Sequence, residues 1–174
     1  PVGYILGLLT IVLGLSMLFP MALDLADGNP NCQAFAVCAI IAVALGASIS
    51  LASANFDFGQ MNVRQAFILT TATWVVLPLI GAMPFVLGAP DVSLTDAYFE
   101  AVSGMTTTGS TVFPGLDALP RGVNLWRGIL QWLGGLGIVI VALIFLPVMR
   151  VGGMQFFRAE GFDTLGKVLP RAID

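Results

Sequence analysis

A run of hydroxyl-bearing residues near the middle of the chain could bind a cation. It consists of Thr106, Thr107, Thr108, Gly109, Ser110 and Thr111. Backbone carbonyls and threonine hydroxyls can replace the water that a potassium ion sheds in a narrow pore. Small side chains and a glycine let consecutive carbonyls face one way, because glycine adopts backbone angles that a side chain would forbid. The alternative is that 106–111 is a polar external turn.

The residues before this loop predict a short helix. Ser93 can cap it, and Asp96 follows three residues later, as in a capping box. Apolar residues then recur every three or four positions between Leu94 and Met105. A helix of about 12 residues is roughly 18 Å long, which is about half the thickness of a bilayer core. We therefore expect a pore half-helix at 94–105, followed by a re-entrant selectivity-filter loop at 106–111.

Composition identifies the chain as an integral membrane protein. Of its 174 residues, 57% are hydrophobic and only 10% are charged, whereas a soluble domain carries about 25% charged residues. The predicted fold is all-α, with four transmembrane helices and the half-helix between the last two. Pro20 is expected to bend the end of the first helix, and residues 113–124 are expected to return irregularly to the surface. The four predicted spans are residues 3–23, 32–53, 65–88 and 125–149.

The sequence lacks the groups on which several kinds of chemistry depend. It has no histidine, the commonest general base and metal ligand. It has no phosphate-binding loop, dinucleotide fingerprint or nucleophile elbow. Cys32 and Cys38 do not share a helix face, so we expect two buried thiols and no disulfide. The sequence therefore predicts neither an enzyme nor a cofactor, and it indicates no nucleic-acid partner.

Basic residues predict the orientation in the membrane. Arg121 and Arg127 lie on one side of the predicted layout. Because cytoplasmic segments are enriched in Lys and Arg, the side with more basic residues should be cytoplasmic, together with both termini. An acidic turn at Asp24 and Asp27 then faces outward. The five basic residues on the cytoplasmic side are Arg64, Arg150, Arg158, Lys167 and Arg171.

Three glycines in the fourth span, Gly134, Gly135 and Gly137, thin the helix and let a neighbour approach closely. One explanation of these glycines is ordinary packing between helices. The alternative is that they leave a gap that receives the half-helix or that they act as a gating hinge. Arg127 lies in an outer turn of the same span, where a charge needs a partner. Its candidate partners are Asp96, Glu100 and Asp117. With Asp91, these acids either raise the cation concentration at an entrance or form a solvated rim.

Three motifs in this order resemble the Trk potassium-uptake family, specifically its TrkH/TrkG branch. They are AVSGMTTTGST at 101–111, WRGILQWLGGLG at 126–137 and GGMQFFRAE at 152–160. The resemblance implies that 65–149 is one of four helix–pore loop–helix repeats in a longer chain. Residues 1–54 would be an extra two-helix hairpin, and 150–174 a cytoplasmic tail or the start of the next repeat. The chain is therefore expected to be a fragment.

The resemblance also implies roles for the loop residues. Thr107, Thr108 and Gly109 match the filter, with Gly109 at its single glycine and Ser110 beside it. Thr106 and Thr111 would support the filter. Potassium would bind at Thr107 and Thr108. Ser110 and Thr111 stand where tetrameric channels have a tyrosine and a second glycine, so weaker selectivity and acceptance of rubidium are expected.

The implied function is potassium uptake across the bacterial inner membrane, through a channel or by symport. The implied partners are the remaining repeats, a second copy in a homodimer, a cytosolic nucleotide-binding regulatory subunit and the lipid bilayer. The competing hypothesis is a non-transporting membrane scaffold or assembly subunit with a polar external turn. Sequence beyond Asp174 should separate the two, because further helix–loop–helix units with a filter glycine would favour transport.

Overall fold

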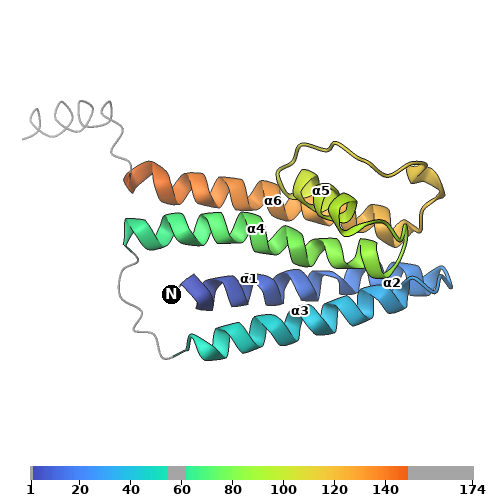
Figure 1. Ribbon diagram of the computed structural model, residues 1–174, viewed down its shortest axis with the longest axis horizontal. Helices are drawn as coiled ribbons and strands as arrows, with labels where there is room; N and C mark the ends of the chain where they lie inside the picture. Colours follow the sequence, from blue (N-terminus) through green and yellow to red (C-terminus); the bar gives the residue numbers. More distant parts are fainter. Residues whose placement is uncertain (1, 55–61, 149–174) are drawn as a thin grey trace, which may run out of the picture. The chain divides into compact units, whose positions relative to one another are not determined.

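The computed structural model describes residues 2–54 and 62–148, and these residues form helices and connecting segments only (Figure 1). The predicted all-α fold is confirmed. The chain divides into two compact units, Pro1–Gly137 and Ile138–Asp174, and the packing below concerns the first. The elements are α1 (Val2–Ser16), α2 (Leu18–Ala26), α3 (Cys32–Ala52), α4 (Val63–Leu87), α5 (Leu94–Met105), a 3-10 turn (Leu116–Ala118) and α6 (Arg121–Val148).

Four helical segments of the described chain are long and apolar enough to cross a membrane. They are Val2–Ala26, Cys32–Ala52, Arg64–Leu87 and Arg121–Val141. The fourth begins four residues earlier than the predicted start at 125. Pro120 directly precedes it, and proline suits a helix start because it has no N–H that needs a partner there. The predicted tail at 150–174, with its four basic residues, lies outside the described residues, as does the end of the fourth span at Met149.

The first span is broken rather than gently bent. α1 ends at Ser16 and α2 begins at Leu18. Pro20 has no N–H to donate to the Ser16 carbonyl, and its ring crowds that carbonyl, so the helix breaks one turn before the proline. The helix then continues to Ala26, beyond the predicted end at Leu23. The predicted acidic turn begins later than expected: Asp24 lies inside α2 with its side chain fully buried, whereas Asp27 lies in the turn that follows.

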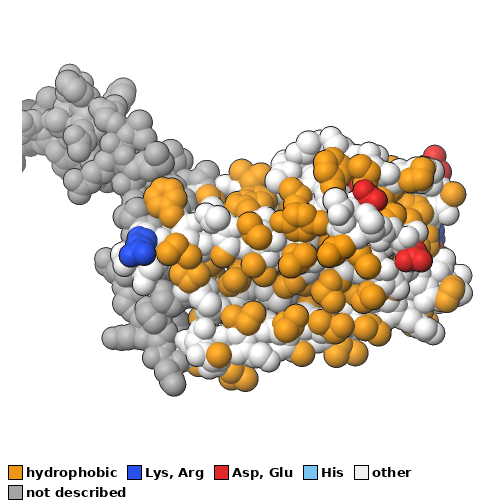
Figure 2. Space-filling model, in the orientation of Figure 1, with side chains coloured by type: hydrophobic (Ala, Val, Ile, Leu, Met, Phe, Trp, Pro, Cys, Tyr) orange, Lys and Arg blue, Asp and Glu red, His pale blue; other side chains and the backbone are white. Residues whose placement is uncertain are grey.

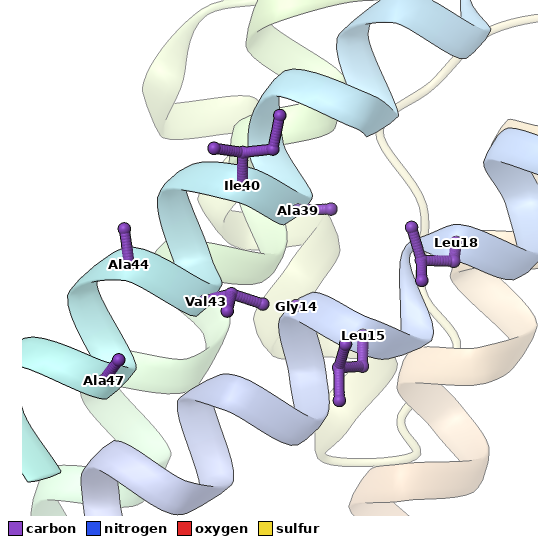
Figure 3. Close-up of a pocket in the computed structure, with 8 residues that line it drawn as sticks. All are labelled: Gly14, Leu15, Leu18, Ala39, Ile40, Val43, Ala44 and Ala47. Atoms are coloured by element: carbon purple, nitrogen blue, oxygen red, sulfur yellow. The ribbon is translucent and has the colours of Figure 1, made fainter.

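Small residues bring α1 and α3 together along their length (Figure 1). A Cβ added at Gly7 would lie 2.6 Å from the carbonyl oxygen of Gly46, so the two backbones touch. Ser50 donates a hydrogen bond of 3.4 Å to the carbonyl of Tyr4 across the same contact. Farther along the pair, Gly14 and Val43 help to line an apolar groove at the surface between the two helices (Figure 3).

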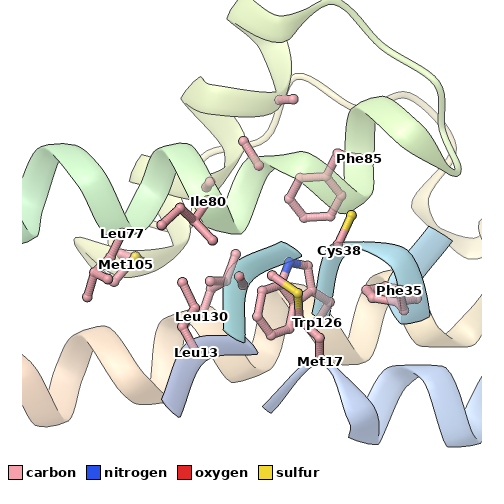
Figure 4. Packing of buried hydrophobic residues seen from close by; sticks show 14 of the residues in the cluster. Leu13, Met17, Phe35, Cys38, Leu77, Ile80, Phe85, Met105, Trp126 and Leu130 are labelled. Atoms are coloured by element: carbon pink, nitrogen blue, oxygen red, sulfur yellow. The ribbon is translucent and has the colours of Figure 1, made fainter. Parts of the chain in front are cut away.

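A hydrophobic core joins the N-terminal helices to α4, α5 and α6 (Figure 4). The indole of Trp126 is fully buried and packs edge-on against Phe35, with ring centroids 6.3 Å apart. Its Nε1 donates a hydrogen bond of 2.9 Å to the carbonyl of Gly81, between the two prolines of α4. Cys38 is buried in this core, as predicted, whereas Cys32 is only half-buried, and both are free thiols.

Hydrophobic side chains cover much of the outer surface of the helices, and acidic side chains gather at one end of them (Figure 2). Arg64 is exposed at the start of α4, and Asp91 is exposed just beyond the end of that helix. Asp27, Asp96 and Asp117 are exposed as well. The acid-rich end carries both ends of the segment between α4 and α6, which contains α5 and the candidate loop.

Candidate cation-binding loop

The half-helix that precedes the loop forms over the predicted residues, Leu94–Met105. Ser93 caps it: the Ser93 Oγ accepts a hydrogen bond of 3.2 Å from the Asp96 amide and donates one of 2.8 Å to the Asp96 carboxylate. At the other end, the Thr106 amide still bonds to the Val102 carbonyl at 2.8 Å. The C-terminus of the helix, which carries a partial negative charge, therefore lies directly beside the loop.

Two left-handed residues give the loop its shape. Gly109 has a φ of +76° and Thr107 has a φ of +58°. The sequence predicted such an angle for the glycine only, because a β-branched residue rarely adopts it. The amides of Thr108 and Gly109 both turn back toward the helix and donate to the Ser103 carbonyl, at 3.0 and 3.2 Å.

Turning the amides inward leaves the carbonyls of the same residues free. Among the described residues, none donates a hydrogen bond to the carbonyl oxygens of 106–109, and all four residues are exposed. Thr106 Oγ1 bonds to the Val102 carbonyl at 2.8 Å and lies 2.8 Å from Thr108 Oγ1. The loop thus presents consecutive carbonyl oxygens that have no partner among the described residues, which is what coordination of a dehydrated cation requires.

Ser103 is the residue of this site that sequence reasoning missed. Besides accepting the two loop amides, it donates a hydrogen bond of 2.6 Å from its Oγ to the Ser110 carbonyl. The Ser110 carbonyl is therefore turned toward α5, unlike the free carbonyls before it. The available signal was a small polar residue in the last helical turn, where carbonyls have no intrahelical partner.

A buried ion pair fixes the outgoing limb of the loop. Glu100 is only 3% exposed, and one of its carboxylate oxygens accepts hydrogen bonds from Thr111 Oγ1 at 2.9 Å and the Val112 amide at 3.1 Å. Its other oxygen accepts from Arg127 Nε at 2.6 Å. Of the three candidate partners for Arg127, the structure selects Glu100. Because Glu100 is buried, it is not part of an acidic rim, and Thr111 faces this carboxylate.

The glycines at 134, 135 and 137 of α6 have different surroundings. A Cβ at Gly134 would overlap the carbonyl of Met105, so the end of α5 rests directly on the α6 backbone. A Cβ at Gly135 would meet Thr107 Cγ2 at an ordinary 3.6 Å, and one at Gly137 would meet nothing within 4 Å. Close approach of α5 therefore explains Gly134, whereas nothing in the described surroundings requires a glycine at Gly135 or Gly137.

The site as a whole is an arrangement of uncharged oxygen donors. The described residues contain no group of three or more acidic, histidine or cysteine side chains that could hold a metal ion. A cation at 106–109 would therefore be bound by carbonyls and hydroxyls, with the negative end of α5 behind them.

The chain is similar to a known family of membrane proteins. Residues 31–173 match the family described as TrkH, cation transport protein. The Trk system potassium uptake protein TrkI of Halomonas elongata is 39% identical over 98% of this chain and 35% of its own length. The TrkH protein of Escherichia coli K12 is 38% identical over 90% of this chain and 32% of its own length.

The fold has a counterpart of known structure. The crystal structure of the potassium transporter TrkH from Vibrio parahaemolyticus matches 87% of this chain and 32% of its own, with a TM-score of 0.80 and 34% sequence identity. The chain spans about a third of the length of the relatives it matches. It is part of a multi-pass membrane protein, and by the match over 31–173 it belongs to the TrkH family of cation transport proteins.

Proposed function

We propose that this chain contributes to a potassium-uptake protein and that residues 106–111 are one part of its selectivity filter. The observation that carries the proposal is the row of free carbonyls at 106–109, built by left-handed Thr107 and Gly109 and held from behind by Ser103. Potassium would be coordinated chiefly at Thr107 and Thr108. Rubidium, which is similar in size, would be accepted as well.

The relatives support potassium as the ion, because their names describe potassium uptake. One loop cannot surround an ion, so further repeats of a longer chain would complete the pore. Because one limb of the loop is tied to Glu100 through Thr111, those repeats would meet the exposed side of 106–110. Ser110 would close the filter with its side chain rather than its carbonyl, which is turned toward Ser103.

The same proposal places the protein in the bacterial inner membrane, with both ends of this chain cytoplasmic. A second copy and a cytosolic nucleotide-binding regulatory subunit would be its partners. The exposed acids at one end of the helices, including Asp27 and Asp117, would then lie outside the cell. That charge arrangement would attract cations to the side from which potassium is taken up.

The proposal is tested by replacing Gly109 with serine in the complete protein. A side chain at this left-handed position costs roughly 1–3 kcal/mol, and each 1.4 kcal/mol is about tenfold in an equilibrium. Gly109→Ser should therefore lower the preference for potassium over sodium by about tenfold, measured by ion uptake with sodium as competitor. Thr108→Val should have a smaller effect, because it removes a hydroxyl and keeps the carbonyl.

Gly115 provides the matched control. It is also left-handed, with a φ of +62°, but a Cβ there would meet nothing within 4 Å. Gly115→Ser introduces the same backbone strain outside the loop and should leave ion preference unchanged. Normal selectivity in a transporting Gly109→Ser variant would contradict the filter assignment and favour the scaffold alternative.

A further inference from the structure

The segment between α4 and α6 begins and ends at backbone amides that bond to side chains of the N-terminal helices. At its start, the amide of Ala89 donates a hydrogen bond of 2.8 Å to Asn31 Oδ1. At its end, the amide of Gly122 donates one of 2.7 Å to Asp24 Oδ1. Asp24 lies in the last turn of α2 and Asn31 directly precedes α3, so both acceptors are far from the segment in sequence.

The two acceptors are also bonded to each other. Asn31 Nδ2 donates a hydrogen bond of 2.8 Å to Asp24 Oδ2. Asp24 is fully buried, and Asn31 is 8% exposed. An unbroken chain of hydrogen bonds therefore runs from Ala89 through Asn31 and Asp24 to Gly122. We call the side chains of Asp24 and Asn31 the clasp.

The backbone at both ends leaves room for the clasp. A Cβ at Gly88 would overlap Asn31 Oδ1, and a Cβ at Gly122 would overlap the Asp24 carboxylate. Gly122 is in the first turn of α6, where amides lack intrahelical partners and a carboxylate is stabilised by the helix dipole. Close approach and polar pairing thus coincide at each end of the segment.

We propose that the clasp positions the filter by holding the two ends of the segment that contains α5 and the loop. The inference rests on the proposed function of residues 106–111. Changing the spacing of the segment's ends would shift α5 against α6, where Met105 and Gly134 are in backbone contact. The N-terminal helices then take part in ion selection without touching the ion. Asp24 and Asn31 are positioning residues.

The clasp can be broken and restored with the same two side-chain types. In Asp24→Asn, an amide that keeps its oxygen on the Gly122 amide turns its own NH2 group toward Asn31 Nδ2. Two donors then face each other, so the bond between the two side chains is lost in the present arrangement. The double variant Asp24→Asn/Asn31→Asp exchanges the residues and permits all three bonds. Asp27→Asn is the matched control, since Asp27 is partly exposed and pairs only with the exposed Arg121.

The measurement is potassium uptake by the complete protein in the presence of sodium, with the amount of folded protein in the membrane determined in parallel. Asp24→Asn should lower the preference for potassium by about threefold to tenfold, as expected for the loss of a buried hydrogen bond. The exchanged pair should recover at least half of this loss on a logarithmic scale, and Asp27→Asn should match the wild type. If Asp24→Asn fails to accumulate, recovery of both accumulation and preference in the exchanged pair supports the clasp.

An unchanged preference in Asp24→Asn would overturn the clasp, and so would an exchanged pair as impaired as the single variant. Gly109→Ser, measured alongside, separates the two proposals. A shift in Gly109→Ser without one in Asp24→Asn refutes the clasp alone. No shift in Gly109→Ser refutes the filter on which the clasp depends.

Discussion

Two buried carboxylates bond to the segment between α4 and α6, and their negative charges are compensated in different ways. Within the described residues, the Asp24 carboxylate accepts hydrogen bonds from uncharged groups only, the amide of Gly122 and the side chain of Asn31. Glu100 bonds an amide too, that of Val112, but it also forms an ion pair with Arg127. Asp24 acts at the ends of the segment, and Glu100 acts beside the loop itself.

The difference between Asp24 and Glu100 shows which buried carboxylate requires a positively charged partner. Asp24 faces the first turn of a long helix, whose free amides and dipole offset part of its charge. Glu100 lies in the middle of α5, and its carboxylate pairs with the side chain of Arg127. A guanidinium supplies the compensation there. Substitutions near the two carboxylates should therefore have unequal effects.

The largest effect is expected from Arg127→Gln, which leaves the Glu100 carboxylate buried without its cation. Breaking a buried ion pair costs about 3–5 kcal/mol, whereas removing both charges costs much less. Arg127→Gln should strongly lower the melting temperature of the purified complete protein. The double variant Glu100→Gln/Arg127→Gln should recover much of the loss.

Arg121→Gln is the control for that experiment. Arg121 pairs with Asp27 at 3.2 Å, but its side chain is 72% exposed, and exposed pairs contribute less than about 1 kcal/mol. The melting temperature of the Arg121→Gln variant should therefore stay close to that of the wild type. If Arg121→Gln and Arg127→Gln lowered the melting temperature equally, burial of Glu100 would not explain the destabilisation.

A smaller effect is expected at two close-packed glycines of α6, Gly134 and Gly122. Gly134→Ala forces a methyl group into the Met105 backbone, which cannot rotate away, so a destabilisation of about 1–3 kcal/mol follows. Gly122→Ala meets only the Asp24 side chain, which can shift, and should cost less. Thermal unfolding should rank the variants in that order.

Gly135→Ala completes this series, since its methyl group would meet Thr107 at an ordinary distance of 3.6 Å. It should be the mildest of the three. If Gly135→Ala were as damaging as Gly134→Ala, the direct contact between α5 and α6 would not explain the glycine run.

Local sequence signals predicted the elements around the loop well. The cap at Ser93 and the apolar stripe after it lie within a few residues of one another, so α5 was predicted at 94–105 and forms there. Gly109 was predicted to be left-handed because glycine tolerates that conformation. The pairing of Arg127 with Glu100 was among the predicted alternatives.

Features that depend on distant residues were not predicted. Asp24 looked like part of an exposed turn because its acceptor role requires Gly122, which is far along the chain. The left-handed Thr107 contradicts the preference of its residue type, and the surrounding contacts impose it. The single close glycine, Gly134, could not be separated from Gly135 and Gly137 until the position of Met105 was known.

The central claim is that the carbonyls of 106–109 face an ion. Anomalous diffraction from crystals of the complete protein grown in rubidium would test this claim most directly, because rubidium replaces potassium and marks its own position. We predict an anomalous peak against the carbonyl oxygens of Thr107 and Thr108. A well-ordered loop without such a peak, or with these carbonyls bonded to amides of another part of the protein, would contradict the account.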